Sequence, residues 1–401
     1  MPQLDALGVA LALAAGLALA WLAVLAAFSG PLVARWREPV FRVPILVIES
    51  DDWGAGPDTQ AELLAAIAAT LARIRDTTGQ PALMTLGMVF EMPDGARIAR
   101  EGFTTYHGLT LDDTRFTALR ETIAAGIRAG VFVPQLHGQC HYWPPALMAA
   151  AAREGRVRAW LAAGGRSEDL PSPLQSRWVD AWALPSRPLA AADIDAAARR
   201  EAASFAQCFG HPPRVAVPTT FVWNAAVEAA WQRAGVAVVV TPGRRATCRA
   251  AAGQPGCVDR RILTGERSDA GQTYLVRDVY FEPARGHTPE RLVEGLALRT
   301  RQGRACLVET HRVNFLDQPD ASLVALEAGL AACRARFPTL RFLAPEAIAH
   351  AIATHDPALI ERRWLPRLVA WRARLHEIPL WTRIARLSGL AVPLKLIGLA
   401  A

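Results

Sequence analysis

Residues 43–54 read VPILVIESDDWG, an apolar run that ends in two adjacent aspartates. The β-branched residues in the run are typical of a buried strand in a parallel sheet. Neighbouring carboxylates repel each other, and each loses favourable hydration when it is buried. A bound cation is the simplest partner that would stabilise Asp51 and Asp52 together, so the stretch predicts a metal site at the end of a strand.

The region from about 40 to 355 alternates between short apolar runs and helical segments. The runs predict strands at 43–48, 82–89, 131–136, 214–217, 236–241, 274–279, 306–309 and 340–343. Helices are expected between them at 59–75, 111–129, 145–163, 190–209, 225–234, 288–302 and 320–337. Strands and helices in this order pair in parallel, in an α/β barrel or a doubly wound sheet, and about eight strands favour closure into a barrel. The fold class is therefore α/β, with loops expected at 164–188 and 242–256.

The N-terminal segment predicts a membrane anchor within residues 1–34. Residues 6–28 carry no charge, and a helix of that length crosses a hydrocarbon core of about 30 Å. A secretory signal peptide would have a basic flank before a shorter apolar run. Arginines follow at 35, 37 and 42. This bias favours the inner (cytoplasmic) membrane, with the main domain on the cytoplasmic side.

The C-terminal segment, 356–401, combines arginine with tryptophan and leucine at roughly helical spacing. Trp364, Trp371 and Trp381 alternate with seven arginines between 362 and 386. This pattern is typical of basic amphipathic helices on an anionic membrane surface, so membrane lipid is an expected partner. A helix packed on the domain with a solvated arginine face is an equal alternative. Pro366 and Pro379 are expected to break the helix into short pieces.

The charge and the cysteines exclude some functions. The formal net charge is +7, Lys395 is the only lysine, and no arginine block with interleaved aromatics occurs in the body of the chain. Nucleic acid is therefore not an expected partner. The six cysteines form no Cys-x-x-Cys pair, which argues against a zinc ribbon. Cys248 and Cys257 could pair in an oxidising compartment, although reduced thiols are the more ordinary expectation.

A second polar cluster supplies ligands that would complete a metal site. His137 and His141 lie in HGQCH, directly after the third apolar run. With one carboxylate of the aspartate pair they form a His₂Asp set with open positions, the pattern of a catalytic zinc or similar divalent ion. Water on such an ion loses a proton near neutral pH, and the second aspartate can accept that proton. His311, at the end of a late strand, is the candidate acid.

Each of these features has an ordinary explanation when it is taken alone. A histidine pair at this spacing arises by chance, and two aspartates can cap a helix. His311 by itself is more typical of a core or capping histidine. Only the conjunction of aspartates and histidines at the ends of separate strands favours the metal site.

In this order the motifs SDDWG (50–54), HGQCH (137–141), FEP (281–283) and THRVNF (310–315) resemble the polysaccharide deacetylase (NodB-homology) family of metal-dependent carbohydrate esterases. The resemblance covers about residues 43–345. It implies a distorted (β/α) barrel of about seven strands within 40–355. It also implies Asp51 as catalytic base, His311 as catalytic acid, and Asp52, His137 and His141 as metal ligands. The implied metal is Zn²⁺, with Co²⁺ or Ni²⁺ as substitutes, and the implied reaction removes an acetyl group from a glycan or glycolipid.

The sequence departs from the family pattern in two places. The first family motif usually reads Thr-Phe-Asp-Asp-Gly, and here Trp53 follows the aspartates and would narrow the mouth of the site. The family also carries an arginine just before a proline-bearing turn, where it steadies the base. The nearest arginine here is Arg214, four residues before Pro218. Either Arg277 or Arg312 takes that role, or the base is tuned in another way.

Four aromatic residues near the motifs predict a wall that stacks on sugar rings. They are Trp53, Tyr142, Trp143 and Trp223, and any one of them alone would be more typical of the core. Asn224 and Glu282 are expected as partners of sugar hydroxyls.

The sequence therefore predicts a membrane-anchored, metal-dependent deacetylase in the biosynthesis of an exopolysaccharide or envelope glycan. One alternative is another metal-dependent hydrolase on the same barrel, which would cut a different amide or a glycosidic bond. The other is a non-catalytic scaffold in a polysaccharide-assembly complex, which would bind no metal.

Overall fold

The opening stretch forms the central strand of the sheet in a computed structural model that describes residues 6–396. All ten residues of this strand, β1 (Ile45–Gly54), are buried. β1 pairs in parallel with β2 (Met84–Val89) on one side and with β14 (Cys306–His311) on the other. The predicted strand is therefore present, and it continues through the two aspartates instead of ending before them.

The remaining strands close the sheet into a distorted barrel. Beyond β2 the order continues through β5 (Phe132–Gly138), β8 (Val215–Ala216), β9 (Val238–Thr241) and β12 (Thr273–Val276). Beyond β14 lies β13 (Val279–Tyr280), and β15 (Arg341–Phe342) pairs with the start of β1. Only Arg277 and Asp278 separate β12 from β13, so one bent segment joins both edges of the sheet. The predicted α/β barrel of about seven strands is confirmed.

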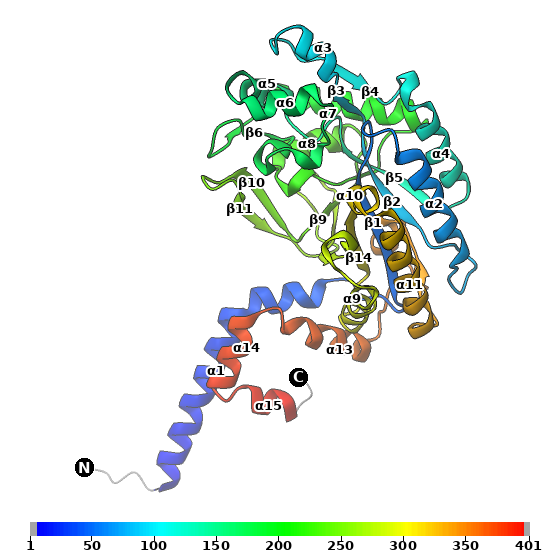
Figure 1. Cartoon of the computed structure of the whole chain (residues 1–401). Coiled ribbons are helices and arrows are strands. Elements are labelled where there is room, and N and C mark those ends of the chain that lie inside the picture. Colours follow the sequence, from blue (N-terminus) through cyan, green and yellow to red (C-terminus); the bar gives the residue numbers. More distant parts are fainter. Residues whose placement is uncertain (1–5, 397–401) are drawn as a thin grey trace.

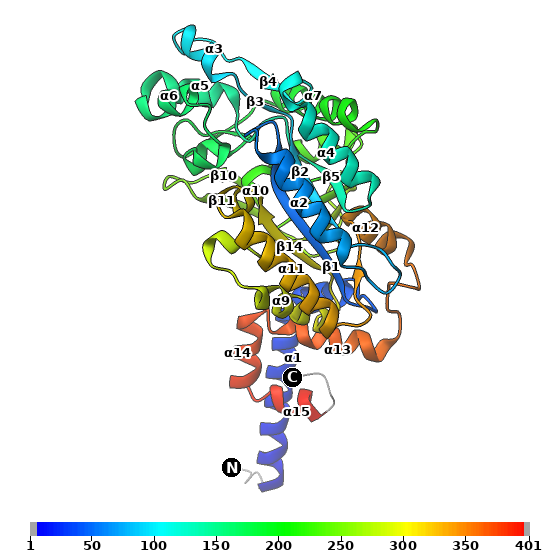
Figure 2. The same ribbon diagram turned by 45° about the vertical axis from the view of Figure 1, so that its right-hand side comes forward.

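Helices surround the barrel, as Figures 1 and 2 show. They include α2 (Gln60–Arg73), α4 (Thr117–Arg128), α7 (Ala191–Phe209), α8 (Ala225–Arg233), α9 (Pro289–Arg301), α11 (Pro319–Arg336) and α12 (Pro345–Thr354). They bury apolar side chains in one core, against the sheet or against one another. In α2 the buried side chains Leu64, Ile67 and Leu71 recur at the three- and four-residue spacing of one helix face.

Several segments differ from the prediction. The helix expected at 145–163 is two helices, α5 (Pro144–Arg153) and α6 (Gly155–Ala162), because Glu154 between them is extended. The loop expected at 242–256 is mostly a hairpin of β10 (Arg244–Arg249) and β11 (Pro255–Arg261). The 164–188 segment carries only short elements, η2 (Ser167–Asp169), η3 (Ser172–Gln175), β6 (Val179–Asp180) and β7 (Arg187–Pro188). Further short elements are β3 (Glu91–Pro93), α3 (Gly95–Arg100), β4 (Gly108–Thr110) and α10 (Arg312–Asp317).

The hairpin carries the disulfide that the sequence left open. Cys248 and Cys257 are bonded across it, with their Cα atoms 5.7 Å apart, a separation typical of disulfides. The other four cysteines are free. The expectation of reduced thiols is therefore wrong for this one pair.

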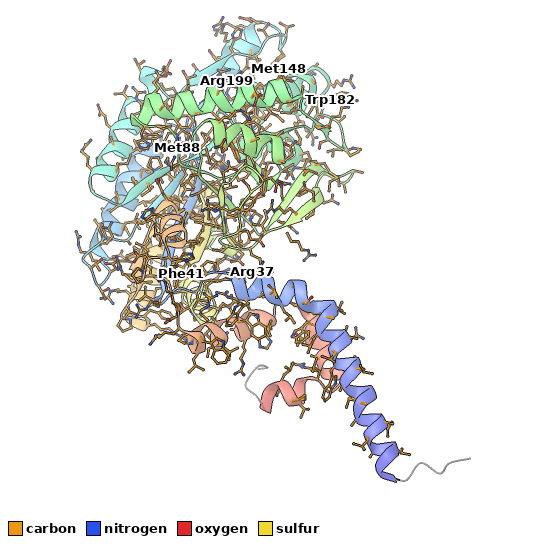
Figure 3. The ribbon with its side chains drawn as sticks, turned by 180° about the vertical axis from the view of Figure 1, so that it is seen from behind. Arg37, Phe41, Met88, Met148, Trp182 and Arg199 are labelled. Carbon is orange, nitrogen blue, oxygen red and sulfur yellow. A yellow bond between two sulfur atoms is a disulfide. The ribbon has the colours of Figure 1, made fainter. Side chains whose placement is uncertain are left out.

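The N-terminal helix, α1 (Ala6–Arg37), has 32 residues and continues past the predicted apolar segment. None of its most apolar stretch is buried, and it is long and apolar enough to cross a membrane. A membrane anchor and a signal sequence both have this character. α1 leads straight into the barrel, and Figure 3 shows Arg37 and Phe41 at one end of the barrel, with Met148 and Trp182 at the other.

The C-terminal segment forms three short helices, α13 (Trp364–Leu375), α14 (Pro379–Leu387) and α15 (Ala391–Leu396). Pro366 does not break α13, because it lies in the first turn, where the backbone N–H has no partner in the helix. Pro379 begins α14, as Pro does at many helix starts. The last part of the predicted apolar tail, after Leu396, lies outside the described residues.

Candidate metal centre and active site

A β-bulge at the end of β1 brings both aspartates to the mouth of the barrel. The register between β1 and β2 shifts between Ser50 and Trp53, and Asp52 has a φ of 76°. Neighbouring side chains of a regular strand face opposite sides, whereas a bulge re-aims one of them. A non-glycine residue in this backbone region costs about 1–3 kcal/mol, and such residues cluster at functional sites.

Gly87 of β2 makes room for the first aspartate. A Cβ atom at this position would lie 2.4 Å from Oδ1 of Asp51 and 3.1 Å from its Cα. No larger residue fits there unless Asp51 moves. The neighbouring strand is therefore shaped around this carboxylate.

Three predicted ligand atoms meet beside the bulge. Oδ1 of Asp52 lies 3.3 Å from Nε2 of His137 and 3.1 Å from Nε2 of His141. His137 is part of β5, and His141 lies in the loop that follows, so two neighbouring regions of the barrel mouth supply the set. All three residues are buried. Among the described residues, no other group of three or more His, Cys, Asp or Glu side chains is arranged to hold a metal ion.

The chemistry of these atoms fits a divalent cation. Nδ1 of His137 lies 2.9 Å from the carbonyl oxygen of Val217, which can only accept a hydrogen bond. In the neutral ring the proton is therefore on Nδ1, and Nε2 turns its lone pair toward Asp52. Oδ1 of Asp52 and Nδ1 of His141 have no hydrogen-bond partner among the described residues. Two ligands at 2.0–2.1 Å from a tetrahedral ion lie about 3.3 Å apart, close to the separations seen here.

Asp51 is held by a fully buried arginine. Its Oδ2 accepts a hydrogen bond of 2.6 Å from Nη2 of Arg277, the residue between β12 and β13. Burial alone would raise the pKa of Asp51, but the charge of Arg277, followed by that of His137, brings it below the ordinary value. Asp51 is therefore ionised at neutral pH, the form in which a carboxylate can accept a proton.

The two other arginines considered for this role lie elsewhere. Arg214 is exposed and pairs with Glu346 at 3.3 Å. Arg312 is buried but points toward the 164–188 segment, where it pairs with Glu168 at 2.8 Å. Of the three, Arg277 alone contacts the carboxylate of Asp51.

Arg277 also faces two further carboxylates. Glu49 of β1 lies 3.6 Å from it and Glu309 of β14 lies 3.3 Å from it. Burial raises the pKa of Glu49 to about 7, even though Arg277 opposes the shift. Burial likewise raises the pKa of Glu309. One buried arginine therefore forms ion pairs with three carboxylates. The sequence pattern did not indicate a role for Glu49 or Glu309.

His311 stands opposite Asp51 in the register of β1 and β14. Its Nδ1 lies 2.6 Å from Oε1 of Glu282, whose other oxygen accepts a hydrogen bond of 2.7 Å from Asn314. Burial lowers the pKa of His311, but the hydrogen bond with Glu282 and the charges of Asp52 and Glu309 outweigh it and raise the pKa to about 10. The side chain remains 30% exposed. It can therefore hold a proton at neutral pH and reach a bound molecule.

Two predicted partners of sugar hydroxyls have other roles. Both oxygens of Glu282 are engaged by His311 and Asn314, so Glu282 positions the histidine. Asn224 caps α8, since its Oδ1 accepts a hydrogen bond of 3.2 Å from the backbone N–H of Val227. The FEP motif drew attention to Glu282, but the motif alone does not indicate that Glu282 contacts His311.

The predicted aromatic wall is mostly core. Trp53 and Trp223 have no exposed surface and Tyr142 has 2%, so in this conformation none of the three can stack on a sugar. The indole of Trp53 donates to Ser50, and that of Trp223 donates to Glu228. Trp143 alone of the four is partly exposed.

The His141 side of the site is closed to a sugar ring. It borders a cavity of about 20 Å³ that is also lined by Trp160 and Gly164, which is room for about one water molecule. On the other side of the site, His311 of β14 keeps a partly exposed side chain.

Three solved structures illustrate what the chain is similar to. A family 4 carbohydrate esterase from Streptomyces lividans has 15% identity and a TM-score of 0.34, covering 74% of this chain and 90% of that one. A peptidoglycan N-acetylglucosamine deacetylase has 9% identity and a TM-score of 0.36, covering 78% and 91%. The 4-alpha-glucanotransferase from Thermococcus litoralis has 9% identity and a TM-score of 0.38, covering 76% and 40%.

No family model matches the chain, and no curated protein matches it. The similar structures include carbohydrate esterases and deacetylases. They also include a glucanotransferase. Likeness at these identities and TM-scores is too weak to carry an inference about the reaction, which has to be judged from the site itself.

Proposed function

We propose that the protein is a metal-dependent carbohydrate deacetylase that is anchored in a membrane. One observation carries the proposal: the Asp52, His137 and His141 ligand atoms gather within 4.8 Å of one another, between a carboxylate held by Arg277 and a histidine held by Glu282. A metal site flanked by a base and an acid is what hydrolysis of an amide or ester requires.

The residues would divide the work as follows. A divalent ion held by Asp52, His137 and His141, most simply Zn²⁺, would lower the pKa of water and polarise the acetyl carbonyl. Asp51 takes a proton from the water as the water oxygen bonds to the carbonyl carbon. Arg277 keeps Asp51 ionised until then. His311 gives its proton to the leaving nitrogen or oxygen as the bond to the acetyl carbon breaks, and acetate and a free amine or hydroxyl result.

The contacts of α1 support a retained anchor. Nε1 of Trp21 donates a hydrogen bond of 2.8 Å to the carbonyl of Ser388, and the ring of Phe28 lies edge-on to Trp381 at 5.6 Å. A signal sequence that is cleaved off would leave these partners exposed. We therefore assign α1 as a single membrane span that stays on the protein.

The side of the membrane follows from two opposed observations. The arginines after the apolar segment favour the cytoplasm, whereas a disulfide persists in oxidising compartments. Arg35 is already used in an ion pair with Glu377 at 3.1 Å, and Arg42 donates to the carbonyl of Pro357. Because the fold itself uses these two arginines, we give more weight to the Cys248–Cys257 bond and place the barrel on the oxidising side. Rapid alkylation of intact cells followed by mass analysis of the hairpin should find that pair protected; an alkylated pair would place the barrel in the cytoplasm.

The test of the reaction is acetate release by the full-length, membrane-inserted protein. A panel of soluble N- and O-acetylated oligosaccharides is incubated with the wild type and with Asp51→Asn. Acetate from at least one saccharide, lost in the variant, supports the proposal. Reducing ends without acetate would indicate a glycosidic hydrolase. No product together with no bound divalent metal would indicate a scaffold.

A further inference from the structure

The end of the barrel opposite the active site is joined to the anchor by a buried arginine. Arg374 of α13 has no exposed surface, and its guanidinium donates to five backbone carbonyls. They belong to Arg35, Glu38 and Pro39 at the end of α1, and to Gln302 and Gly303 at the end of α9. Free carbonyls at helix ends are acceptors that need partners. One side chain therefore connects the anchor, the C-terminal helices and the barrel.

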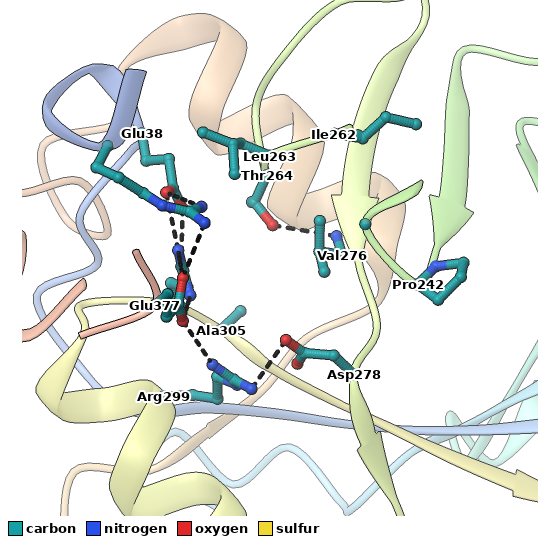
Figure 4. A pocket seen from close by; sticks show the side chains of 13 residues that line it. Glu38, Pro242, Ile262, Leu263, Thr264, Val276, Asp278, Arg299, Ala305 and Glu377 are labelled. Carbon is teal, nitrogen blue, oxygen red and sulfur yellow. Dashed lines mark hydrogen bonds and ion pairs between the residues drawn. The ribbon is translucent and has the colours of Figure 1, made fainter. Parts of the chain in front are cut away.

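A cluster of ion pairs reinforces the same junction. Arg304, at the start of β14, donates to both Glu38 and Glu377, with distances of 2.5–3.0 Å. Arg299 of α9 pairs with Asp278 at 2.8 Å and with Glu377 at 3.3 Å. All of these residues line a cavity of about 170 Å³. Figure 4 shows Glu38, Asp278, Arg299 and Glu377 around it. The Arg304–Glu38 pair is buried, and such a pair resists separation because removal of one partner leaves an uncompensated charge.

The C-terminal helices also pack along α1 at positions farther from the barrel. Nε1 of Trp371 donates a hydrogen bond of 2.9 Å to the carbonyl of Leu32 in α1. Farther out, α14 packs on α1 around Phe28 and Trp381. In Figures 1 and 2, α1, α13, α14 and α15 lie together on one side of the barrel. The anchor therefore contacts the C-terminal helices at several positions along its length. These contacts oppose a simple hinge at residue 37 between the anchor and the barrel.

Most of the exposed large apolar side chains gather at this end of the molecule. Of nineteen large apolar side chains exposed in the described residues, thirteen lie on α1 or between 364 and 392. On the C-terminal helices they are Trp364, Leu365, Val369, Leu380, Leu387 and Val392. Exposed arginines at 362, 363, 383 and 386 accompany them. Apolar groups bordered by arginine suit the boundary between acyl chains and anionic headgroups.

The metal site lies at the far end of β1. Ile45 pairs with β15 near the base, and Asp52 is seven residues farther along the same strand. At about 3.3 Å per residue this is roughly 23 Å. α13 lies between the barrel and the apolar surface, and a packed helix layer adds about 8–10 Å. The mouth is therefore about 30 Å from the bilayer surface and opens away from it.

From this arrangement we infer that the substrate is a segment of an acetylated polymer that extends away from the membrane, and not a sugar attached directly to a lipid headgroup. A sugar on a lipid would lie at the level of these arginines, at the end of the barrel opposite the metal site. The clamp around Arg374 prevents the barrel from tilting its mouth down to reach it. The inference rests on the proposed deacetylase function and on α1 as an anchor.

The test varies the distance of one acetylated saccharide from the bilayer. The soluble oligosaccharide that full-length protein in nanodiscs deacetylates fastest is attached to a phospholipid, either directly or through a flexible spacer much longer than 30 Å. Both probes are placed in the nanodisc that holds the protein. We expect acetate release from the long-spacer probe, and release at least about a hundredfold slower from the direct probe.

Each outcome separates this inference from the proposed function. Equal rates for the two lipid probes would overturn the inference and leave the deacetylase standing. If none of the soluble saccharides releases acetate, the proposed function itself fails. In detergent, where the bilayer no longer fixes the distance, the direct probe should become a substrate, which shows that the lipid alone does not block turnover.

A measurement without catalysis tests the same geometry. Single fluorophores are attached at two exposed positions in a Cys208→Ser background. One is Ala163→Cys, next to Gly164 of the cavity beside His141, and the other is Arg301→Cys, at the end of α9 near the base. Energy transfer to acceptors on lipid headgroups should be strong from position 301 and weak from position 163. Equal transfer from both positions would mean that the barrel lies on its side, and the inference would be wrong.

Discussion

The two ends of the barrel each bury an arginine among acidic residues, but they satisfy it differently. At the mouth, Arg277 faces Glu49, Asp51 and Glu309, and its Nε and Nη1 have no hydrogen-bond partner among the described residues. At the base, Arg304 makes five hydrogen bonds to Glu38, Gln302 and Glu377. Three carboxylates therefore share one arginine at the mouth, whereas each guanidinium nitrogen of Arg304 has a hydrogen-bond partner.

This difference is the one expected between a functional site and a purely structural contact. Buried polar atoms are nearly always satisfied, so a cluster that is not satisfied points to an absent ion, water or substrate. Perturbed pKa values at the mouth point the same way. At the base, every contact of Arg304 and Arg374 ends on protein. We therefore expect substitutions at the mouth to change activity and those at the base to change stability.

The largest effect should come from a metal ligand. Asp52→Ala removes the carboxylate between His137 and His141, and loss of the charge stabilisation by the ion should lower acetate release roughly 10³-fold or more. The exposed Glu346→Ala serves as the control and should be unaffected. Activity near wild type in Asp52→Ala would show that the reaction uses another site.

The next largest effect is expected at Asp51, the proposed catalytic base. Asp51→Asn removes the proton acceptor but keeps its size, so kcat should fall about 10²- to 10⁴-fold, the range of general base catalysis. Metal content should stay at the wild-type level, because Asp51 is not among the three gathered ligand atoms. A variant that loses its metal as well would make Asp51 a ligand and not the base.

Substitution of one buried arginine at each end tests the comparison between the mouth and the base of the barrel. Arg277→Met should reduce activity about 10- to 100-fold, the usual size for a residue that orients a reacting group. Arg374→Met should lower the free energy of unfolding by about 3–5 kcal/mol, since it leaves buried groups without partners, and should leave the kcat of the folded fraction unchanged. Denaturant unfolding and kinetics on the same samples check both. A loss of kcat in Arg374→Met with normal stability would remove the distinction between the two ends.

A smaller and pH-dependent effect is expected at Glu282. Its carboxylate raises the pKa of His311, and the acid works only while it is protonated. Glu282→Gln removes that charge, so the pKa of His311 falls and the alkaline limb of the kcat profile moves to lower pH, with about a tenfold loss at neutral pH. An unchanged limb would mean that His311 is not the acid.

The smallest effect should come from Trp53, which the sequence placed in a sugar-binding wall. The ring is buried and donates to Ser50, so Trp53→Phe should cost about 1 kcal/mol of stability through the lost hydrogen bond. KM for the saccharide should stay within about twofold. A large rise in KM without a loss of stability would show that Trp53 contacts the sugar after a rearrangement.

The parts of the fold that follow from periodicity were predictable. The strand at 43–48 and the helix at 59–75 carry local apolar patterns, and both are present as β1 and α2. The hairpin of β10 and β11 was not predicted, because its register depends on pairing across a turn of small residues. Burial of the aromatic residues could not be predicted either, since a tryptophan at the end of a strand can turn inward or outward.

The site was predictable as far as residue types and strand ends determine it. Asp52, His137 and His141 were named from motif positions, and the structure brings them together. Arg277 and Glu282 were named with their roles open or misassigned, because a contact across the barrel leaves no local pattern. The bulge at Asp52 was invisible too: its backbone angle is imposed by the pairing of β1 with β2.

Metal analysis of the purified full-length protein tests the central claim most directly. The geometry predicts one divalent ion per chain in the wild type and in Asp51→Asn, and close to none in His137→Ala. Chains of wild type that bind no divalent ion after loading with Zn²⁺, or His137→Ala chains that still bind one, would contradict the metal centre and the hydrolytic function built on it.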